Sequence, residues 1–177
     1  MIDVDEAVVN LCTANRRYGK ASISRRCRHE GPFQREDSTR IMLAIMGDPV
    51  LGRRWAEIHH RRSGTTCEEF YNFMLRIITD LGPGTPERRF CFILDNLIVH
   101  TTPVVLLLII MAGHRYVFRA PYWPKDGPIE YVYNRLEQEL NIRMNEVFCD
   151  ADLAQIIRET LGNIRSFTKW FLHVGYY

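Results

Sequence analysis

The chain has 177 residues, of which 46% are hydrophobic and 25% are charged. These values are typical of a globular protein and exclude global disorder, and the length suits one domain with at most a small C-terminal addition. The longest apolar run, Val104 to Ala112, is about half of the roughly 20 residues that cross a bilayer. The N-terminus is acidic, unlike a secretory signal. We therefore expect no membrane partner and no secretion.

The cysteines and the basic residues narrow the class of protein further. Five scattered cysteines without a Cys-x-x-Cys pair favour free thiols over a disulfide framework or a zinc site. The net charge is only +2, but residues 1–62 carry twelve basic and eight acidic residues, and the other 115 carry eleven and thirteen. Twenty of the basic residues are arginines, several of them in doublets. Guanidinium groups bind phosphate well, so a nucleic-acid partner is one interpretation and a solvated surface is the other.

The first third of the chain has the pattern of strands. Hydrophobic and polar residues alternate or cluster in short runs bounded by Gly, Pro and charged turns, which predicts an antiparallel meander. Because the first predicted strand begins at Met1, we expect that a segment normally in front of it is missing. The predicted strands cover residues 1–13, 17–23, 39–47 and 53–60.

From Thr65 onward the pattern changes to helices that alternate with strands. Apolar residues at helical spacing, two early glutamates and a Gly-Pro-Gly stop predict a helix that ends at Leu81. Then follow, in order, a buried strand (89–95), a buried helix (103–112), a strand (114–119), a loop (120–127), a helix from Pro128 to Leu140, a helix (150–162) and an aromatic tail. This order predicts an α/β fold with a mixed sheet, first antiparallel and then parallel, and helices on both faces.

Three acids occupy positions where sites collect in such folds. Asp5 lies in the first strand, Asp95 closes a buried strand, and Glu130 begins a helix. The carboxyl ends of parallel strands and the adjoining loops commonly carry the site, so the three acids could meet there. Each acid also has a purely structural interpretation, because an aspartate can cap a turn and an early glutamate favours a helix. Asp3 lies on the same strand face as Asp5 and is the alternative first acid.

Three sequence motifs together resemble the catalytic core of the DDE superfamily endonucleases, specifically the mariner-type transposases. They are Asp5-Glu6 followed by Arg-Arg-Tyr-Gly-Lys-Ala (16–21), Phe-Ile-Leu-Asp-Asn-Leu-Ile-Val-His (92–100), and Pro-Tyr-Trp-Pro-Lys-Asp-Gly-Pro-Ile-Glu (121–130). The spacing between Asp95 and Glu130 leaves 34 residues between them, which matches one branch of the family. The resemblance extends from about Asp3 to Leu140.

The resemblance implies a ribonuclease H-like catalytic domain, which we assign to residues 1–145. We expect the helical segment that follows, residues 146–177, to form a C-terminal extension packed on the same domain. The resemblance also implies two Mg²⁺ or Mn²⁺ ions held by Asp5, Asp95 and Glu130, which would hydrolyse and transesterify DNA phosphodiesters. Oxygen ligands and paired ions suit this chemistry. By the same resemblance, Asn96, His100 and Tyr122 would support the metal ligands or position the substrate. The residues that would contact DNA are Arg16, Arg17, Lys20, Arg25 and Arg26.

The chain departs from the family motifs at two positions. Gly127 replaces an asparagine before Pro-Ile-Glu and removes a side-chain helix cap, which predicts looser placement of Glu130, and Trp123 replaces a serine. Mariner-type transposases carry helix-turn-helix modules ahead of the first catalytic strand, so we expect this chain not to mobilise an element alone.

Two other functions fit the same sequence features. They are an inactive transposase-derived DNA-binding or assembly protein, and a ribonuclease H-like nuclease that acts on RNA or hybrids. We expect DNA as partner, no small-molecule cofactor, and a nuclear location in a eukaryote or a cytoplasmic one otherwise. A homodimer is compatible with these functions.

Overall fold

A five-stranded mixed sheet forms the centre of the protein. The computed structural model describes residues 1–9, 23, 38–48, 50, 52–61, 64–120 and 127–176. The sheet has the strand order β3-β2-β1-β4-β5. Its strands are β1 (Ile2–Val9), β2 (Ser38–Met46), β3 (Arg54–Arg61), β4 (Cys91–Leu94) and β5 (Arg115–Phe118).

The pairing of the strands confirms the predicted change from antiparallel to parallel. β2 pairs antiparallel with both β1 and β3. β4 pairs parallel with both β1 and β5. The predicted strand 1–13 is described as far as Val9, and of the predicted strand 17–23 only Ile23 lies within the described residues. The meander seen here therefore consists of β1, β2 and β3.

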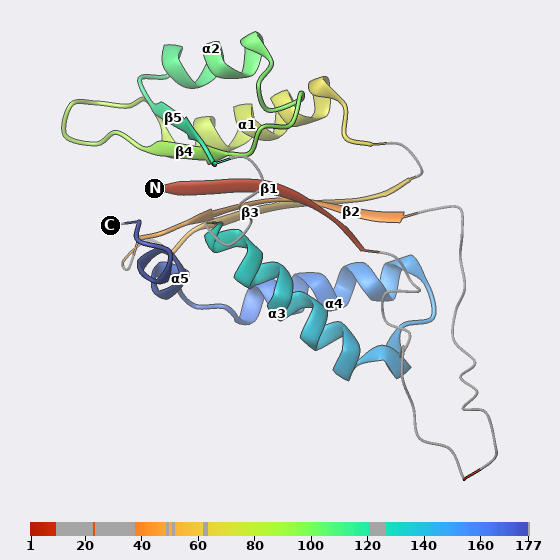
Figure 1. Cartoon of the computed structure of the whole chain (residues 1–177). Helices are drawn as coiled ribbons and strands as arrows, with labels where there is room; N and C mark the ends of the chain where they lie inside the picture. The colour runs from red at the N-terminus through yellow and green to blue at the C-terminus, as the bar shows by residue number, and fades with distance from the viewer. Residues whose placement is uncertain are drawn as a thin grey trace.

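Helices cover both faces of the sheet, as the sequence predicts (Figure 1). One face carries α1 (Cys67–Leu81) and α2 (Pro103–Met111), and the other carries α3 (Pro128–Ile142), α4 (Asp150–Asn163) and α5 (Thr168–His173). A short 3₁₀ helix, Met144–Glu146, joins α3 to α4. The predicted boundary between a catalytic domain and an extension at residue 145 stays a prediction, but the segments on both sides of it share the core beneath α3.

β2 shows why the sheet is covered on both sides. Its alternate residues Ile41, Leu43 and Ile45 are buried against the α3–α5 layer. The residues between them, beginning with Met42 and Ala44, are buried against α1 and α2. Because successive side chains of a strand point to opposite faces, a strand buried on both faces reads as an unbroken apolar run. β2 is such a strand.

α1 is set by strong local signals at both ends. The Thr66 hydroxyl accepts a hydrogen bond from the Glu69 backbone N–H, and the Glu69 carboxylate accepts one from the Thr66 N–H, which completes a capping box. The helix ends at Gly82, whose φ of 76° favours glycine. The predicted helix is confirmed, and its apolar stripe of two phenylalanines, Met74, two isoleucines and Leu81 is buried.

The predicted burial of the helix over residues 103–112 needs correction. α2 is not a buried helix, because Val104, Leu107, Ile110 and Met111 are between 51% and 82% exposed. The helix lies over the β4–β5 end of the sheet, and only one of its sides meets α1 and the sheet. The aromatic tail contains the short helix α5, whose Phe171 is buried closely against Gly47. A Cβ built at Gly47 would lie 2.4 Å from the Phe171 ring.

Among the described residues, no helix is both long and apolar enough to span a bilayer.

Candidate active site

The parallel register of β1 and β4 brings Asp5 and Asp95 to the same level. Asp3 pairs with Ile93, so the residues two positions further on are Asp5 and Asp95. β4 ends at Leu94, whereas β1 continues to Val9. Asp95 therefore lies where β4 ends beside a continuing strand, and both aspartates belong to the sheet face that α3 covers. Two of the three predicted acids are neighbours.

Glu130 joins them because the start of α3 is attached to β1. Asp3 accepts a hydrogen bond from the Ile129 backbone N–H at 2.9 Å, and the Tyr133 hydroxyl donates to the Asp5 carbonyl oxygen at 2.9 Å. The Asp3 carboxylate, which belongs to β1, thus caps the N-terminus of α3. Negative charge is favourable at this end of a helix. The Asp3 carboxylate supplies a cap that Gly127 itself lacks, and the looser placement of Glu130 stays a prediction.

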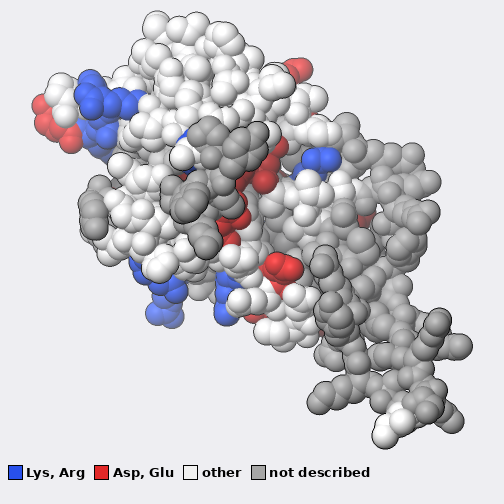
Figure 2. Space-filling view, in the orientation of Figure 1, with Lys and Arg blue, Asp and Glu red and all other residues white. Residues whose placement is uncertain are grey.

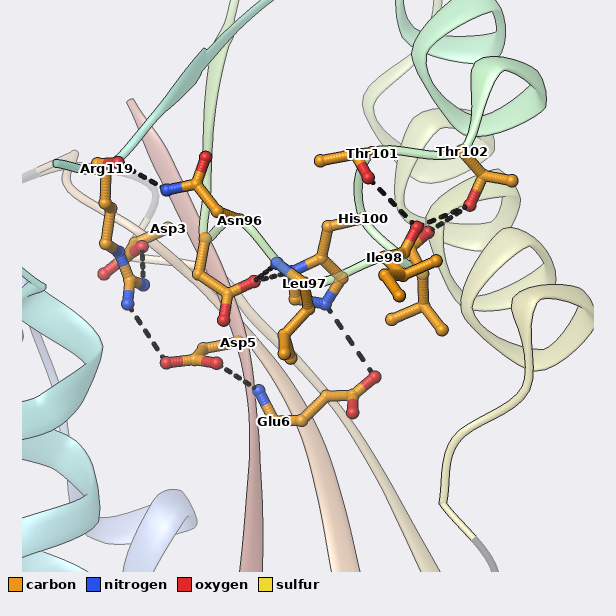
Figure 3. A network of polar contacts seen from close by, with 12 residues as sticks. Asp3, Asp5, Glu6, Asn96, Leu97, Ile98, His100, Thr101, Thr102 and Arg119 are labelled. Atoms are coloured by element: carbon orange, nitrogen blue, oxygen red, sulfur yellow. Dashed lines mark hydrogen bonds and ion pairs between the residues drawn. The ribbon is translucent and has the colours of Figure 1, made fainter. Parts of the chain in front are cut away.

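Arg119 is the residue that sequence reasoning missed. Figure 3 shows its guanidinium between the two aspartates of β1. Its Nη1 donates to Asp5 Oδ2 at 3.0 Å, its Nη2 pairs with Asp3 Oδ1, and all three side chains are buried. The available signal was an arginine that ends the apolar run of β5 immediately before the loop that leads to Glu130.

His100 is buried against the carboxylate of Asp95. Its backbone N–H donates to the Leu97 carbonyl in the turn after β4, and this turn directs the ring back toward the sheet. The Nδ1 atom forms an ion pair with Asp95, while Nε2 lies 3.8 Å from Glu6 Oε1 (Figure 3). The ring stacks on Phe70, with 4.1 Å between ring centroids. His100 is therefore placed to fix the orientation of Asp95.

The titration of this pair follows from its surroundings. Burial alone would lower the pKa of His100, but the carboxylates of Asp95 and Glu6 outweigh it and raise the pKa to about 9. Partial burial opposes ionisation of Asp95, yet His100 and the Leu97 backbone N–H lower the pKa of Asp95 below its ordinary value. Asp95 is ionised at neutral pH. The hydrogen bond that Asp95 accepts from the Leu97 N–H also caps the turn after β4, as the structural interpretation of Asp95 predicted.

The other carboxylates lie in surroundings that disfavour their ionised form. Burial raises the pKa of Asp3 to about 6 despite its arginine partner. Burial also raises the pKa of Asp5, and the nearby charge of Asp95 adds to this rise. The pKa of Glu130 is raised by burial and then by the charge of Asp5. Asp5 therefore interacts electrostatically with both Asp95 and Glu130, which distinguishes it from Asp3.

The remaining predicted site residues divide into two groups. Asn96 is described, and its Nδ2 donates to the Arg119 carbonyl oxygen at 2.9 Å, which fastens the end of β5 to the turn after β4. The others lie outside the described residues, so their predicted roles stay predictions: Tyr122, Arg16, Arg17, Lys20, Arg25 and Arg26.

The donor set suits a hard divalent cation. Within the described ranges, no three His, Cys, Asp or Glu side chains stand as a ready-made metal cluster. Asp5, Asp95 and Glu130 nevertheless offer only oxygen atoms, and the pKa values of Asp5 and Glu130 are raised partly by their neighbours' negative charge. A divalent cation would relieve that repulsion. Acidic side chains gather between the two helical layers on the face seen in Figure 2.

Comparison with known proteins gives structural matches only. Protein-family models and curated protein sequences yield no match. The chain matches a crystal structure of the Mos1 mariner paired-end complex with Mn at a TM-score of 0.79 and 12% identity, over 98% of this chain and 52% of that chain. It matches the same complex with Mg at a TM-score of 0.70 and 13% identity, over 98% and 50% of the two chains.

A further match is the Mos1 transposase catalytic domain with raltegravir and Mg, at a TM-score of 0.64 and 13% identity, over 98% of this chain and 75% of that chain. The protein spans about half the length of the chains in the two paired-end complexes. The predicted resemblance is confirmed in the fold: the chain has the ribonuclease H-like fold of the mariner transposase catalytic domain.

Proposed function

We propose that this chain is a metal-dependent DNA endonuclease and strand-transfer domain of the DDE type. In this proposal Asp5, Asp95 and Glu130 hold two Mg²⁺ or Mn²⁺ ions. The matching Mos1 mariner structures are paired-end complexes with Mn or Mg, which supports divalent metal use here. Other matching structures are a Mos1 paired-end complex with the left transposon end and the Mos1 strand transfer complex, which supports DNA as the partner.

One observation carries the proposal. Three carboxylates that are far apart in the sequence come from β1, the end of β4 and the start of α3, and their charges act on one another. A fold does not need such a cluster for stability, because like charges that share a partly buried site oppose folding. Sites with perturbed carboxylates are typical of catalysis.

The protein groups have separable tasks in this proposal. Asp5 and Asp95 lie side by side to share the ions, and Glu130 completes the set from α3. When bound, paired divalent ions activate the attacking oxygen and stabilise the leaving oxygen of a phosphodiester. His100 keeps Asp95 ionised and oriented, a role of the kind that partners of metal ligands perform. The early arginines would contact DNA phosphates without reading sequence.

The test is cleavage of labelled DNA by the purified chain with Mg²⁺ or Mn²⁺. We expect cleavage that Asp95→Asn and Glu130→Gln abolish. Glu137→Gln is the matched control, because it makes the same change at an exposed position two turns further along α3. Cleavage that survives both substitutions would contradict the proposal. Preference for an RNA–DNA hybrid over duplex DNA would move the activity to a different nuclease class.

A second candidate is a transposase-derived DNA-binding or assembly protein that no longer cleaves. The observation in its favour is the guanidinium of Arg119 against Asp5, which already supplies a positive charge to the site. This candidate predicts salt-dependent DNA binding by a folded chain that cleaves nothing with either metal.

A further inference from the structure

We propose that Arg119 is a resident cation of the acidic site and competes with a divalent metal ion for Asp5. This inference rests on the proposed function, because it concerns the same carboxylates. It adds a residue that controls metal affinity, and it divides the two aspartates of β1 between two tasks. Asp3 permanently anchors the guanidinium, and Asp5 is shared between the guanidinium and the metal.

The position of Arg119 is fixed from its backbone outward. Its N–H donates to the Leu94 carbonyl at 2.8 Å, which extends the pairing of β5 with β4. Its carbonyl accepts the hydrogen bond from Asn96. The side chain, only 6% exposed, then reaches past β4 to β1. Arg119 is thus held on both sides of its Cα before the guanidinium makes any contact.

The space around the guanidinium is also fitted to it. A Cβ at Gly127 would lie 3.0 Å from Arg119 Nη1 and 3.1 Å from its Cζ, so the residue before Pro128 leaves the room that the arginine occupies. Gly127 has φ of −94°, which any residue adopts, so space rather than backbone conformation calls for glycine here. Among the described residues, the buried Arg119 Nε has no hydrogen-bond partner, and the two Nη atoms make the contacts with the aspartates.

The two aspartates differ in how they can respond to a metal ion. Asp3 is fully buried and uses one oxygen for Arg119 and the other for the Ile129 N–H. Releasing Asp3 would uncap α3. Asp5 is 8% exposed, lies level with Asp95, and uses Oδ2 for Arg119 and Oδ1 for the Glu6 N–H. A metal ion that binds Asp5 through Oδ2 meets the guanidinium charge at the oxygen that already holds one of its hydrogen bonds, while Asp3 keeps the other.

The experiment measures Mn²⁺ binding by the loss of the free-ion electron paramagnetic resonance signal at pH 8, without DNA. Asp3→Asn serves as background, because removing Arg119 alone would leave two buried carboxylates without a cation. We expect Asp3→Asn/Arg119→Gln to bind Mn²⁺ about 10-fold more tightly than Asp3→Asn, a difference of about 1.4 kcal/mol. Asp3→Asn/Arg115→Gln is the matched control, since it removes an exposed arginine from the same strand.

The outcomes separate this inference from the proposed function. Mn²⁺ binding that requires Asp5 and Glu130 but is equal or weaker after Arg119→Gln overturns the competition and leaves the metal site standing. An equal gain from Arg115→Gln assigns the effect to net charge and also overturns it. No Mn²⁺ binding by any variant whose near-ultraviolet circular dichroism is native overturns both. Binding that appears only after Arg119→Gln supports the inference most strongly.

Discussion

The pairing of His100 with Asp95 predicts a specific dependence of stability on pH. His100 has a fully buried side chain, and its pKa rises from 6.5 to about 9 on folding. Each pKa unit corresponds to about 1.36 kcal/mol, so protonation of His100 contributes about 3 kcal/mol to the free energy of unfolding. Because the folded pKa is the higher one, this contribution is fully present below pH 6.5 and is lost as the pH rises through 9.

The assay is urea unfolding of the wild type and of His100→Asn, followed by tryptophan fluorescence between pH 6 and pH 10. The wild type should exceed the variant by about 3 kcal/mol more at pH 6 than at pH 10. His173→Asn, which changes an exposed histidine on α5, is the control. A difference between wild type and His100→Asn that stays constant with pH, or that grows as the pH rises, would refute the reasoning.

Three further predictions concern the surroundings of the site. Arg119→Met should lower the free energy of unfolding by about 3–5 kcal/mol at pH 8 because it leaves buried charges unpaired. The loss measured by urea unfolding should shrink toward pH 5, since Asp3, with a pKa of about 6, then takes up a proton. Gly127→Ala should lower the free energy of unfolding by about 1–3 kcal/mol, because the new methyl group crowds Arg119. Gly64→Ala is the control, since a Cβ at Gly64 would meet nothing within 4 Å. Thermal melting compares the two variants. Thr66→Ala should cost about 1 kcal/mol by removing the cap of α1, and an unchanged urea midpoint would contradict this.

The strands and acids could be predicted because their signals are local. An unbroken apolar run marks β4 as buried on both faces, and its end marks Asp95 as a charge at the edge of the core. The 3.6-residue period and the early Glu130 define α3. Alternation in β1 places Asp3 and Asp5 on one face but leaves open which of them meets Asp95. The adjoining Glu6 favours Asp5 as the first acid, and the register with β4 places Asp5 level with Asp95.

The partners of the acids could not be predicted because they depend on long-range geometry. Arg119 and Asp3 are 116 positions apart and meet only because β4 lies between their strands. The cap that Asp3 gives to α3 has the same origin. α2 shows a different limit: nearly all of its residues are apolar, so the sequence does not reveal which side faces the core. An apolar run of this length predicts burial, and the structure exposes much of it.

The central claim is that Asp5, Asp95 and Glu130 form one divalent-cation site. The most direct test is a crystal of the chain soaked in Mn²⁺, with anomalous diffraction recorded at the manganese edge. We predict anomalous density bounded by the three carboxylates, with Arg119 still bonded to Asp3. Density at other residues, or none among the three acids in crystals that diffract well, would contradict the account.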